Sequence, residues 1–128
     1  MASILETKLV TKKFGGFTAV DSVSLSVDPG EIRFIIGPNG AGKSTFFKLV
    51  IGFHTPNAGT ILYKGQNIEK LKLHERINLG MGVKFQAPSV FSELTVLQNL
   101  SLANNREDSL KINDLLNDFS LEKEKNNL

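Results

Sequence analysis

Residues 37–45, Gly-Pro-Asn-Gly-Ala-Gly-Lys-Ser-Thr, place three glycines, one lysine and two hydroxyl side chains next to one another. The stretch satisfies the pattern G-x-x-x-x-G-K-[ST], and it lies between an apolar segment at 32–36 and another at 46–51. Glycines allow successive backbone N–H groups to point into one concavity, and the N-terminus of a following helix adds roughly half a positive charge. The segment is therefore predicted to hold a chain of phosphates.

Three side chains of this segment have the chemistry that such a site needs. Lys43 is expected to reach the outer phosphates, Ser44 to occupy one position on a Mg²⁺ ion that bridges phosphate oxygens, and Thr45 to donate to the inner phosphates. The alternative is a strand–helix turn that binds nothing, and a chance match is expected about once in two hundred chains of this length. The motif alone leaves kinases, GTPases and motor ATPases open, because phosphate geometry does not distinguish them.

Composition narrows the class of protein. A chain of 128 residues with 41% hydrophobic content suits one α/β domain. The 15 basic and 13 acidic residues are interspersed, so no nucleic-acid surface is predicted. The absence of cysteine excludes disulfides, thiolate nucleophiles and zinc–thiolate sites, and it favours a reducing compartment such as the cytoplasm. No apolar run approaches the roughly twenty residues of a membrane span, so a membrane role is expected to be peripheral.

The N-terminal half reads as strands before the glycine-rich segment and as a helix after it. Alternation at 20–27 predicts a half-buried strand, with 5–10 as its antiparallel partner and a hairpin turn at 14–17. After a turn at 28–30, the apolar segment 32–36 predicts a strand covered on both faces, as in a parallel sheet.

The middle of the chain predicts a buried helix over 44–51, which ends at Gly52. Turn residues and β-branched runs then predict turns at 55–59 and 64–67, with strands at 60–63 and 83–86.

The last third reads as helical. Thr95 and Gln98 form a capping-box pair ahead of one apolar stretch, and the spacing of Ile112, Leu115, Leu116 and Phe119 predicts a second helix. Residues 122–127 are polar and are predicted to be solvated surface or a frayed end.

The residues of the glycine-rich segment resemble those of the ATP-binding subunits of ABC transporters, in which Pro-Asn and a final Ser-Thr are typical. The resemblance implies an α/β fold of the P-loop NTPase class: an antiparallel β subdomain, a strand–loop–helix core and the start of a helical subdomain. It implies ATP and Mg²⁺ as cofactors, held by Gly37, Pro38, Asn39, Gly40, Ala41, Gly42, Lys43, Ser44 and Thr45. It also matches Phe14 to the aromatic residue that stacks on adenine; the alternative is a hairpin core residue.

The stretch GVKFQAPSVFSELTVLQNL resembles the segment around the Q-loop of that family. This match implies that Gln86 contacts Mg²⁺ and the attacking water, the one catalytic role assigned within the chain. The following residues match the start of the helical subdomain that docks on membrane-embedded permease subunits. An apolar patch of Val90, Phe91 and Leu94 suits such docking, although core packing explains it equally well.

The family's later elements, a glycine-rich signature loop, an acidic catalytic strand and a switch histidine, are not found in residues 1–128. His54 and His74 are expected to be surface residues and not substitutes for that histidine. We therefore expect 1–128 to be a partial ATP-binding domain that binds nucleotide without turnover. We also expect weak stability, or self-association through exposed sheet edges.

The amino-acid sequences of these motifs are most similar to those of the family branch that imports branched-chain amino acids and urea. The implied role is an ATP-binding subunit that pairs with a second such subunit and lies on the inner face of the cell membrane through the permease. Two alternatives stay open: a non-catalytic nucleotide-binding or interaction fragment, and another ABC-type ATPase. Steady-state phosphate release by the full-length protein distinguishes the transporter ATPase, which releases phosphate, from the non-catalytic alternative, which does not.

Overall fold

A four-stranded antiparallel sheet in the order β2-β1-β3-β4 forms one layer of the first part of the chain. The computed structural model describes residues 3–84, 87, 90–103 and 109–127, without the side chains of 103, 109 and 110. These residues fall into two compact units, Met1–Val83 and Lys84–Leu128. The strands, all in the first unit, are β1 (Leu5–Phe14), β2 (Phe17–Val27), β3 (Ala58–Tyr63) and β4 (Gln66–Asn67).

The predicted N-terminal hairpin is confirmed, and its strands are longer than the sequence pattern indicated. Phe14 pairs with Phe17 across a turn of two glycines, of which Gly15 has a φ of 56°. The alternation that signals a half-buried strand fades toward the hairpin tip, where side chains on both faces are exposed. Backbone pairing therefore continues beyond the residues that the apolar pattern marks.

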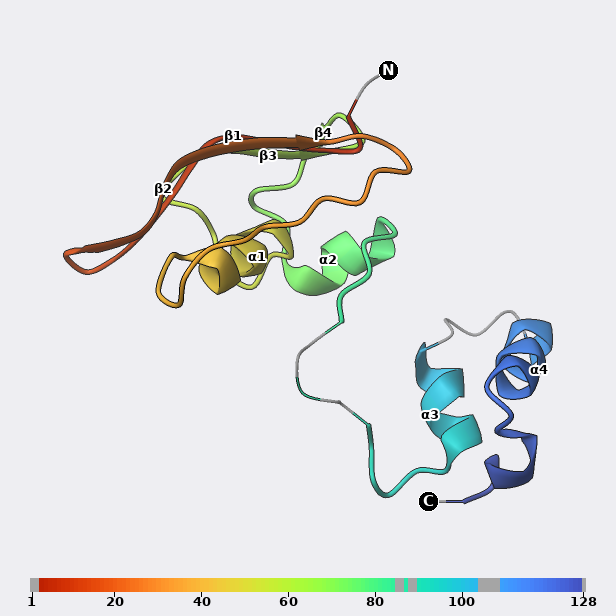
Figure 1. The fold of residues 1–128 in the computed structure, drawn as a ribbon. Coiled ribbons are helices and arrows are strands. Elements are labelled where there is room, and N and C mark those ends of the chain that lie inside the picture. The colour runs from red at the N-terminus through yellow and green to blue at the C-terminus, as the bar shows by residue number, and fades with distance from the viewer. Residues whose placement is uncertain (1–2, 85–86, 88–89, 104–108, 128) are drawn as a thin grey trace. The chain divides into compact units, whose positions relative to one another are not determined.

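Helix α1 (Lys43–Val50) and the shorter α2 (Leu73–Asn78) lie beneath the sheet (Figure 1). The space between these layers holds the core of this unit, formed by Val10, Val20, Phe46, Leu49, Val50, Ile61 and Ile68. The prediction of a helix at 44–51 is confirmed within one residue, but the helix is amphipathic and not buried all round. Phe47 is 50% exposed, because the sheet covers only one side of α1.

A buried arginine and a glycine close the C-terminus of α1. Gly52 has a φ of 84°, and the Phe53 N–H donates to the Lys48 carbonyl at 2.8 Å, as in a Schellman motif. The guanidinium of Arg76, 1% exposed, donates from α2 to the carbonyls of Leu49 and Val50, both at 2.7 Å. Two further bonds from Arg76 go to the carbonyls of Leu71 and Glu69.

This arrangement ties α2 to the end of α1. Burial lowers the pKa of Arg76, and the carboxylate of Glu75 acts in the opposite direction. A cation at a helix C-terminus is favourable because the last carbonyls carry partial negative charge. A Cβ at Gly52 would lie 2.8 Å from the Arg76 Nε, which is too close. The contact between Arg76 and the end of α1 therefore requires a glycine at position 52.

The expected buried strand at 32–36 is wrong for this structure. The segment is irregular, and Ile32, Phe34 and Ile36 are 80%, 77% and 91% exposed. An apolar run forms a strand only when a neighbouring strand supplies its ladder of hydrogen bonds, and no described strand pairs with this segment. The turn before it is confirmed, since the Glu31 N–H donates to the Asp28 carbonyl at 3.1 Å.

Two other expectations about strands need correction. Gln66 and Asn67, expected within a turn, form the short strand β4. Two residues with positive φ, Lys64 at 50° and Gly65 at 77°, suffice to reverse the chain against β3. Val83 and Lys84 are irregular, and the rest of the predicted strand 83–86 lies outside the described residues.

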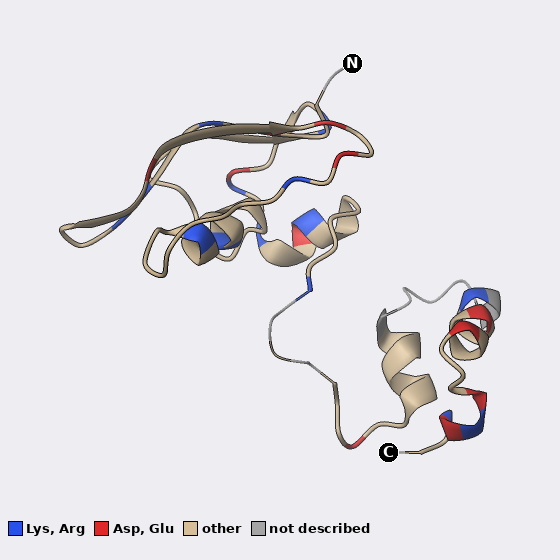
Figure 2. Ribbon diagram, viewed as in Figure 1, with Lys and Arg blue, Asp and Glu red and all other residues tan. Residues whose placement is uncertain are grey.

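The second unit is helical, as predicted, with α3 (Val96–Ala103), α4 (Ser109–Asp118) and the 3₁₀ turn η1 (Glu122–Glu124). The capping box is confirmed: the Thr95 N–H donates to Gln98 Oε1 at 2.9 Å, and the Gln98 N–H donates to Thr95 Oγ1 at 3.2 Å. Helix α3 carries no charged residue, whereas η1 carries both signs (Figure 2). Of the predicted apolar stripe, Ile112 and Leu116 are buried, and Leu115 and Phe119 are exposed.

The polar end of the chain has a structural role that its composition did not indicate. The carbonyls of Asn127 and Lys125 accept hydrogen bonds from the Val96 and Leu97 N–H groups, at 3.0 and 2.9 Å. These two amides are orphan donors of the first turn of α3. Side chains at 122–127 are exposed as expected, but the backbone there caps a helix.

Asn99 orders the loop that leads into α3. Its side-chain amide accepts a hydrogen bond from the Phe91 N–H and donates to the carbonyls of Phe91, Leu94 and Thr95. Phe91 is 62% exposed and the neighbouring Val90 is 73% exposed. Within the described residues, no helix is long and apolar enough to span a bilayer.

Candidate functional site

The glycine-rich segment packs directly on β2 and leads into α1. Gly42 is the N-cap of α1, with a φ of 83°. A Cβ at this position would lie 2.1 Å from the Ala19 carbonyl oxygen. Glycine is therefore required here twice, for the left-handed backbone and for the close approach to the strand.

The backbone amides at the start of α1 are not used by the helix itself. The Phe46 N–H donates to the Gly42 carbonyl at 2.8 Å and so begins the hydrogen-bond ladder. The N–H groups of residues 43–45 precede this bond and belong to the orphan donors of the first turn. Within the loop, the Ala41 N–H donates to the Pro38 carbonyl at 3.2 Å, which closes a tight turn next to Gly40 with its φ of 86°. The arrangement provides donors and a partial positive charge for an anion.

Lys43 folds its side chain back over the loop. Its ammonium donates to the carbonyls of Gly37 at 2.6 Å and Pro38 at 2.7 Å. An ammonium group has three donors, so these two bonds leave one for an outside acceptor. Lys43 can thus brace the loop and still offer a positive charge to a phosphate.

The remaining loop side chains surround the same helix end. Asn39 and Ser44 are exposed, and Thr45 is half-buried. The Ser44 hydroxyl is a hard oxygen donor at the start of α1, which suits Mg²⁺. The described residues contain no cluster of three or more His, Asp or Glu that could hold a metal by itself. A magnesium ion here would depend on oxygens from a bound phosphate, which is its usual mode at nucleotide sites.

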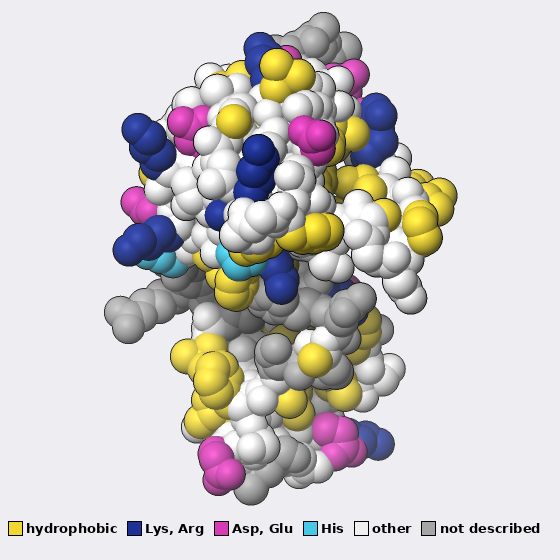
Figure 3. All heavy atoms as spheres, turned by 90° about the vertical axis from the view of Figure 1, so that its left-hand side faces the viewer, with side chains coloured by type: hydrophobic (Ala, Val, Ile, Leu, Met, Phe, Trp, Pro, Cys, Tyr) yellow, Lys and Arg dark blue, Asp and Glu magenta, His cyan; other side chains and the backbone are white. Residues whose placement is uncertain are grey.

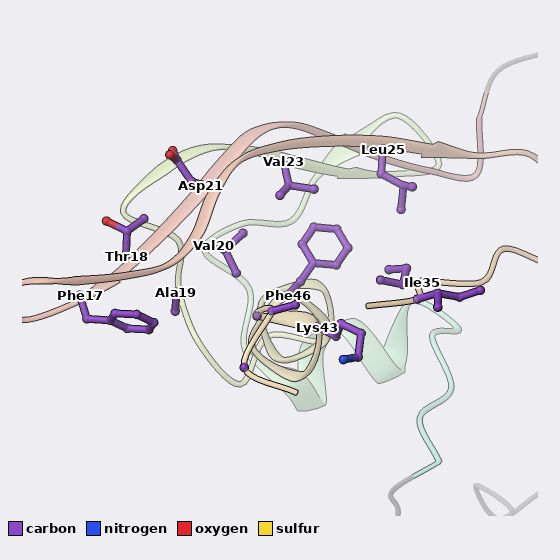
Figure 4. A pocket seen from close by; sticks show the side chains of 14 residues that line it. Phe17, Thr18, Ala19, Val20, Asp21, Val23, Leu25, Ile35, Lys43 and Phe46 are labelled. Carbon is purple, nitrogen blue, oxygen red and sulfur yellow. The ribbon is translucent and has the colours of Figure 1, made fainter. Parts of the chain in front are cut away.

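A cavity of about 570 Å³ lies between β2 and the residues of the loop and of α1. Val20, Val23 and Leu25 point into it from β2 toward Phe46, whereas Thr18 and Asp21 point away (Figure 4). Its other lining residues are Phe17, Ala19, Ile35, Ile36, Gly40, Ala41, Gly42 and Lys43. The aromatic residue from the hairpin tip that faces this cavity is therefore Phe17, and Phe14 is not part of the lining.

Phe14 instead lies against the loop that follows α1. Its ring is 5.4 Å from the ring of His54, at an interplanar angle of 74°, and the Lys12 ammonium lies 5.2 Å from its centroid. Phe14 remains 45% exposed. Phe14 is not among the residues of the core cluster, so the hairpin-core alternative is not supported.

The predicted catalytic residue Gln86 lies outside the described residues, so the structure does not place it relative to the loop. Phe17, Ala19 and His54 were missed by sequence reasoning. Phe17 could have been found, since a two-residue hairpin turn makes it the register partner of Phe14. His54 could not, because its contact with Phe14 joins residues far apart in the sequence.

Charged side chains are dispersed over one face of the first unit. On the face shown in Figure 3, Lys and Arg side chains are separated by uncharged atoms and do not form a stripe.

Near the start of segment 32–36, a hydrogen bond from the Asp28 N–H lowers the pKa of Glu31, and Arg33 contributes in the same direction through its ion pair.

Comparisons with known proteins agree with this geometry. The ABC transporter family matches residues 20–128. The high-affinity branched-chain amino acid transport ATP-binding protein LivG of Escherichia coli is 39% identical over 104 residues, which are 81% of this chain and 41% of that protein. The spermidine/putrescine import ATP-binding protein PotA of Chromobacterium violaceum is 35% identical over 125 residues, 93% of this chain and 34% of that protein.

A solved structure supports the same assignment. The ADP conformation of an ATP-binding cassette of an ABC transporter matches with a TM-score of 0.81 and 29% identity, over 99% of this chain and 57% of that one. The chain thus spans well under two thirds of the length of these relatives. A family match over most of the chain, the fold and the glycine-rich loop at the head of α1 together show that this chain belongs to the ABC transporter family, within its ATP-binding cassettes.

Proposed function

We propose that the chain binds ATP with Mg²⁺ on the loop 37–45, as part of an ATP-binding subunit of an importer. The observation that carries this proposal is the start of α1. Free first-turn amides, a left-handed Gly42 cap seated on β2 and the Lys43 ammonium converge at one helix end. That combination suits a run of phosphates better than a single anion, since it has both a backbone nest and a reaching cation.

Each residue has a distinct part in this proposal. Residues 37–42 and the amides of 43–45 hold the phosphates, and Lys43 places its remaining donor on the outer ones. Ser44 supplies one oxygen to Mg²⁺, and Gln86 is proposed as a second ligand that also orients the attacking water. Bound Mg²⁺ supplies charge neutralisation across the phosphate oxygens.

Phe14 is proposed to stack on the adenine, because an exposed ring at the hairpin tip offers a flat apolar face. Stacking of this kind contributes about 1–3 kcal/mol and depends little on base identity. Phe119, which is 70% exposed and lies in the second unit, provides a control phenylalanine outside the cavity lining. Phe14→Ala is expected to weaken ATP binding by roughly fivefold or more, and Phe119→Ala to leave it unchanged.

The primary test is calorimetric titration of the 128-residue chain with a nonhydrolysable ATP analogue and Mg²⁺. Lys43→Ala removes a charge-assisted contact worth about 1.5–3 kcal/mol and is expected to weaken binding roughly 10- to 100-fold. Lys48→Ala is the matched control, since Lys48 lies in the last turn of the same helix, away from the loop. Absence of heat with the native chain, or equal affinity of the native and Lys43→Ala chains, would refute the proposal.

In the full-length protein, the proposed role is to power uptake of a small polar nutrient. The relatives that carry branched-chain amino acid names support that class of solute, and urea is the second candidate from the same branch. The polyamine importer among the relatives marks how broad the class is. The proposed partners are transmembrane permease subunits and a second ATP-binding subunit, with the protein in the cytoplasm on the inner face of the membrane. Uptake of labelled leucine and of labelled urea, each with Lys43→Ala as the negative control, separates the two solutes.

The 128-residue chain by itself is proposed to bind nucleotide without turnover. Besides Gln86, hydrolysis requires a carboxylate that acts on the attacking water and, in this family, a signature loop from a second subunit. Residues 1–128 contain neither the acidic strand that would supply the carboxylate nor the signature loop. Steady-state phosphate release above the Lys43→Ala background would contradict this proposal.

A further inference from the structure

Two aromatic rings from distant parts of the sequence meet beside the hairpin tip. The ring of His54 lies 5.4 Å from that of Phe14, at 74°, which is an edge-to-face geometry. His54 lies two residues after Gly52, the left-handed glycine that follows the C-cap of α1, and its side chain is half-buried. Such pairs contribute stabilisation beyond the burial of their surface.

The loop that carries His54 is fastened to β1 by three hydrogen bonds. Lys12 Nζ donates to the Thr55 carbonyl at 2.7 Å. The Asn57 N–H donates to the Thr11 carbonyl, and the Lys13 N–H donates to Asn57 Oδ1, both at 2.8 Å. His54 is therefore held at a fixed place relative to the strand that ends in Phe14.

These contacts leave part of the Phe14 ring available. The His54 ring meets the Phe14 ring edge to face and the Lys12 ammonium lies over the Phe14 ring, yet 45% of Phe14 remains exposed. A phenylalanine at a hairpin tip without such contacts would exchange between side-chain rotamers. Binding a ligand to it would then require the ring to be ordered, which reduces affinity.

We propose that His54 is a positioning residue, which holds the Phe14 ring in the orientation that stacks on a nucleotide base. This inference rests on the proposed function, in which Phe14 contacts the adenine. Loss of the ring pair is expected to weaken base-dependent binding roughly threefold to tenfold. It should leave binding to the phosphate loop unchanged, because His54 contacts the hairpin and not residues 37–45.

The experiment compares two probes on the 128-residue chain: a nonhydrolysable ATP analogue with Mg²⁺, and inorganic tripolyphosphate with Mg²⁺, which has no base. The variants are His54→Ala, which removes the ring, and His54→Phe, which restores an aromatic partner. His74→Ala is the control, since His74 is exposed on α2. Phe14→Ala and Lys43→Ala are measured in parallel, with thermal unfolding of every variant.

The inference is supported when His54→Ala weakens binding of the ATP analogue threefold or more and leaves tripolyphosphate binding unchanged. His54→Phe must also restore the affinity for the ATP analogue to within about twofold of the native chain. The inference is overturned when the affinity of His54→Ala for the ATP analogue equals that of His74→Ala, or when His54→Ala weakens binding of both probes equally. It is also overturned when His54→Phe does not restore the affinity for the ATP analogue. A loss with Phe14→Ala but not with His54→Ala overturns this inference alone. An unchanged affinity with Lys43→Ala overturns the proposed function instead.

Discussion

Replacing Arg76 with methionine is expected to destabilise the first unit strongly. The substitution keeps a long apolar stem but removes the guanidinium, which donates to four carbonyls in two segments of chain, 49–50 and 69–71. The bonds to Leu49 and Val50 are buried. The Leu49 carbonyl keeps the Gly52 N–H as a donor, at 3.2 Å, whereas the Val50 carbonyl loses a buried donor without gaining water. The bonds to Leu71 and Glu69 are partly buried, and their carbonyls can be rehydrated.

The expected magnitude follows from the buried Val50 carbonyl. An unsatisfied buried group costs about 1–3 kcal/mol, so Arg76→Met is expected to lower the free energy of unfolding by about 1–3 kcal/mol from this group alone. For a unit of this size each kcal/mol corresponds to about 4–8 °C, so the melting temperature should fall by at least about 4 °C. Arg76→Lys should be intermediate, because an ammonium keeps the charge but lacks the planar fork of donors.

Urea denaturation followed by circular dichroism measures the effect, with the free energy obtained by linear extrapolation. Arg33→Met is the matched control, because Arg33 is exposed and pairs with Glu31 at the surface. Its cost should stay at about 1 kcal/mol or less. If Arg76→Met and Arg33→Met changed stability equally, the reasoning from buried carbonyl acceptors would be wrong.

Three further predictions concern other parts of the chain. Gly42→Ala should abolish nucleotide binding in the calorimetric assay and lower the free energy of unfolding in the urea assay, because its Cβ would collide with the Ala19 carbonyl. Gly40→Ala has open space around its Cβ position, so it should lower the free energy of unfolding by only about 1–2 kcal/mol, the cost of its left-handed backbone. The lowered pKa of Glu31 means that its carboxylate stabilises the folded state above its ordinary pKa of 4.5. The native chain should therefore exceed Glu31→Gln in stability at pH 7, and a pH series of melts should show this advantage shrinking below 4.5 and vanishing once Glu31 is protonated in the folded state. Asn99→Ala should speed hydrogen exchange at the Phe91 amide by roughly fivefold or more, and equal rates would contradict a bracing role.

Much of the local structure could be predicted from residue types alone. The hairpin turn, the helix that begins at Lys43, its end at Gly52 and the capping box of Thr95 and Gln98 are all specified by neighbours within a few positions. Such signals act through backbone conformation and short-range hydrogen bonds, so they are readable without a fold. The phosphate-binding loop belongs to this class.

Other expectations failed because pairing and coverage are not local properties. The apolar run at 32–36 carries the composition of a buried strand, yet strand formation needs a partner that no described segment supplies. Phe47 lies in an apolar stretch, but the sheet covers only one side of its helix. Sequence pattern indicated which residues favour burial, and packing determined which of them are buried.

The sequence by itself determined the phosphate-binding loop, its helix and the family to which both belong, because those features depend on residues that are adjacent in the chain. Tertiary structure alone decided that Gly42 rests on the Ala19 carbonyl, that Arg76 closes the end of α1 and that His54 meets Phe14. Each of these contacts joins segments separated by more than twenty residues, and their distances are set by how the sheet and helices pack.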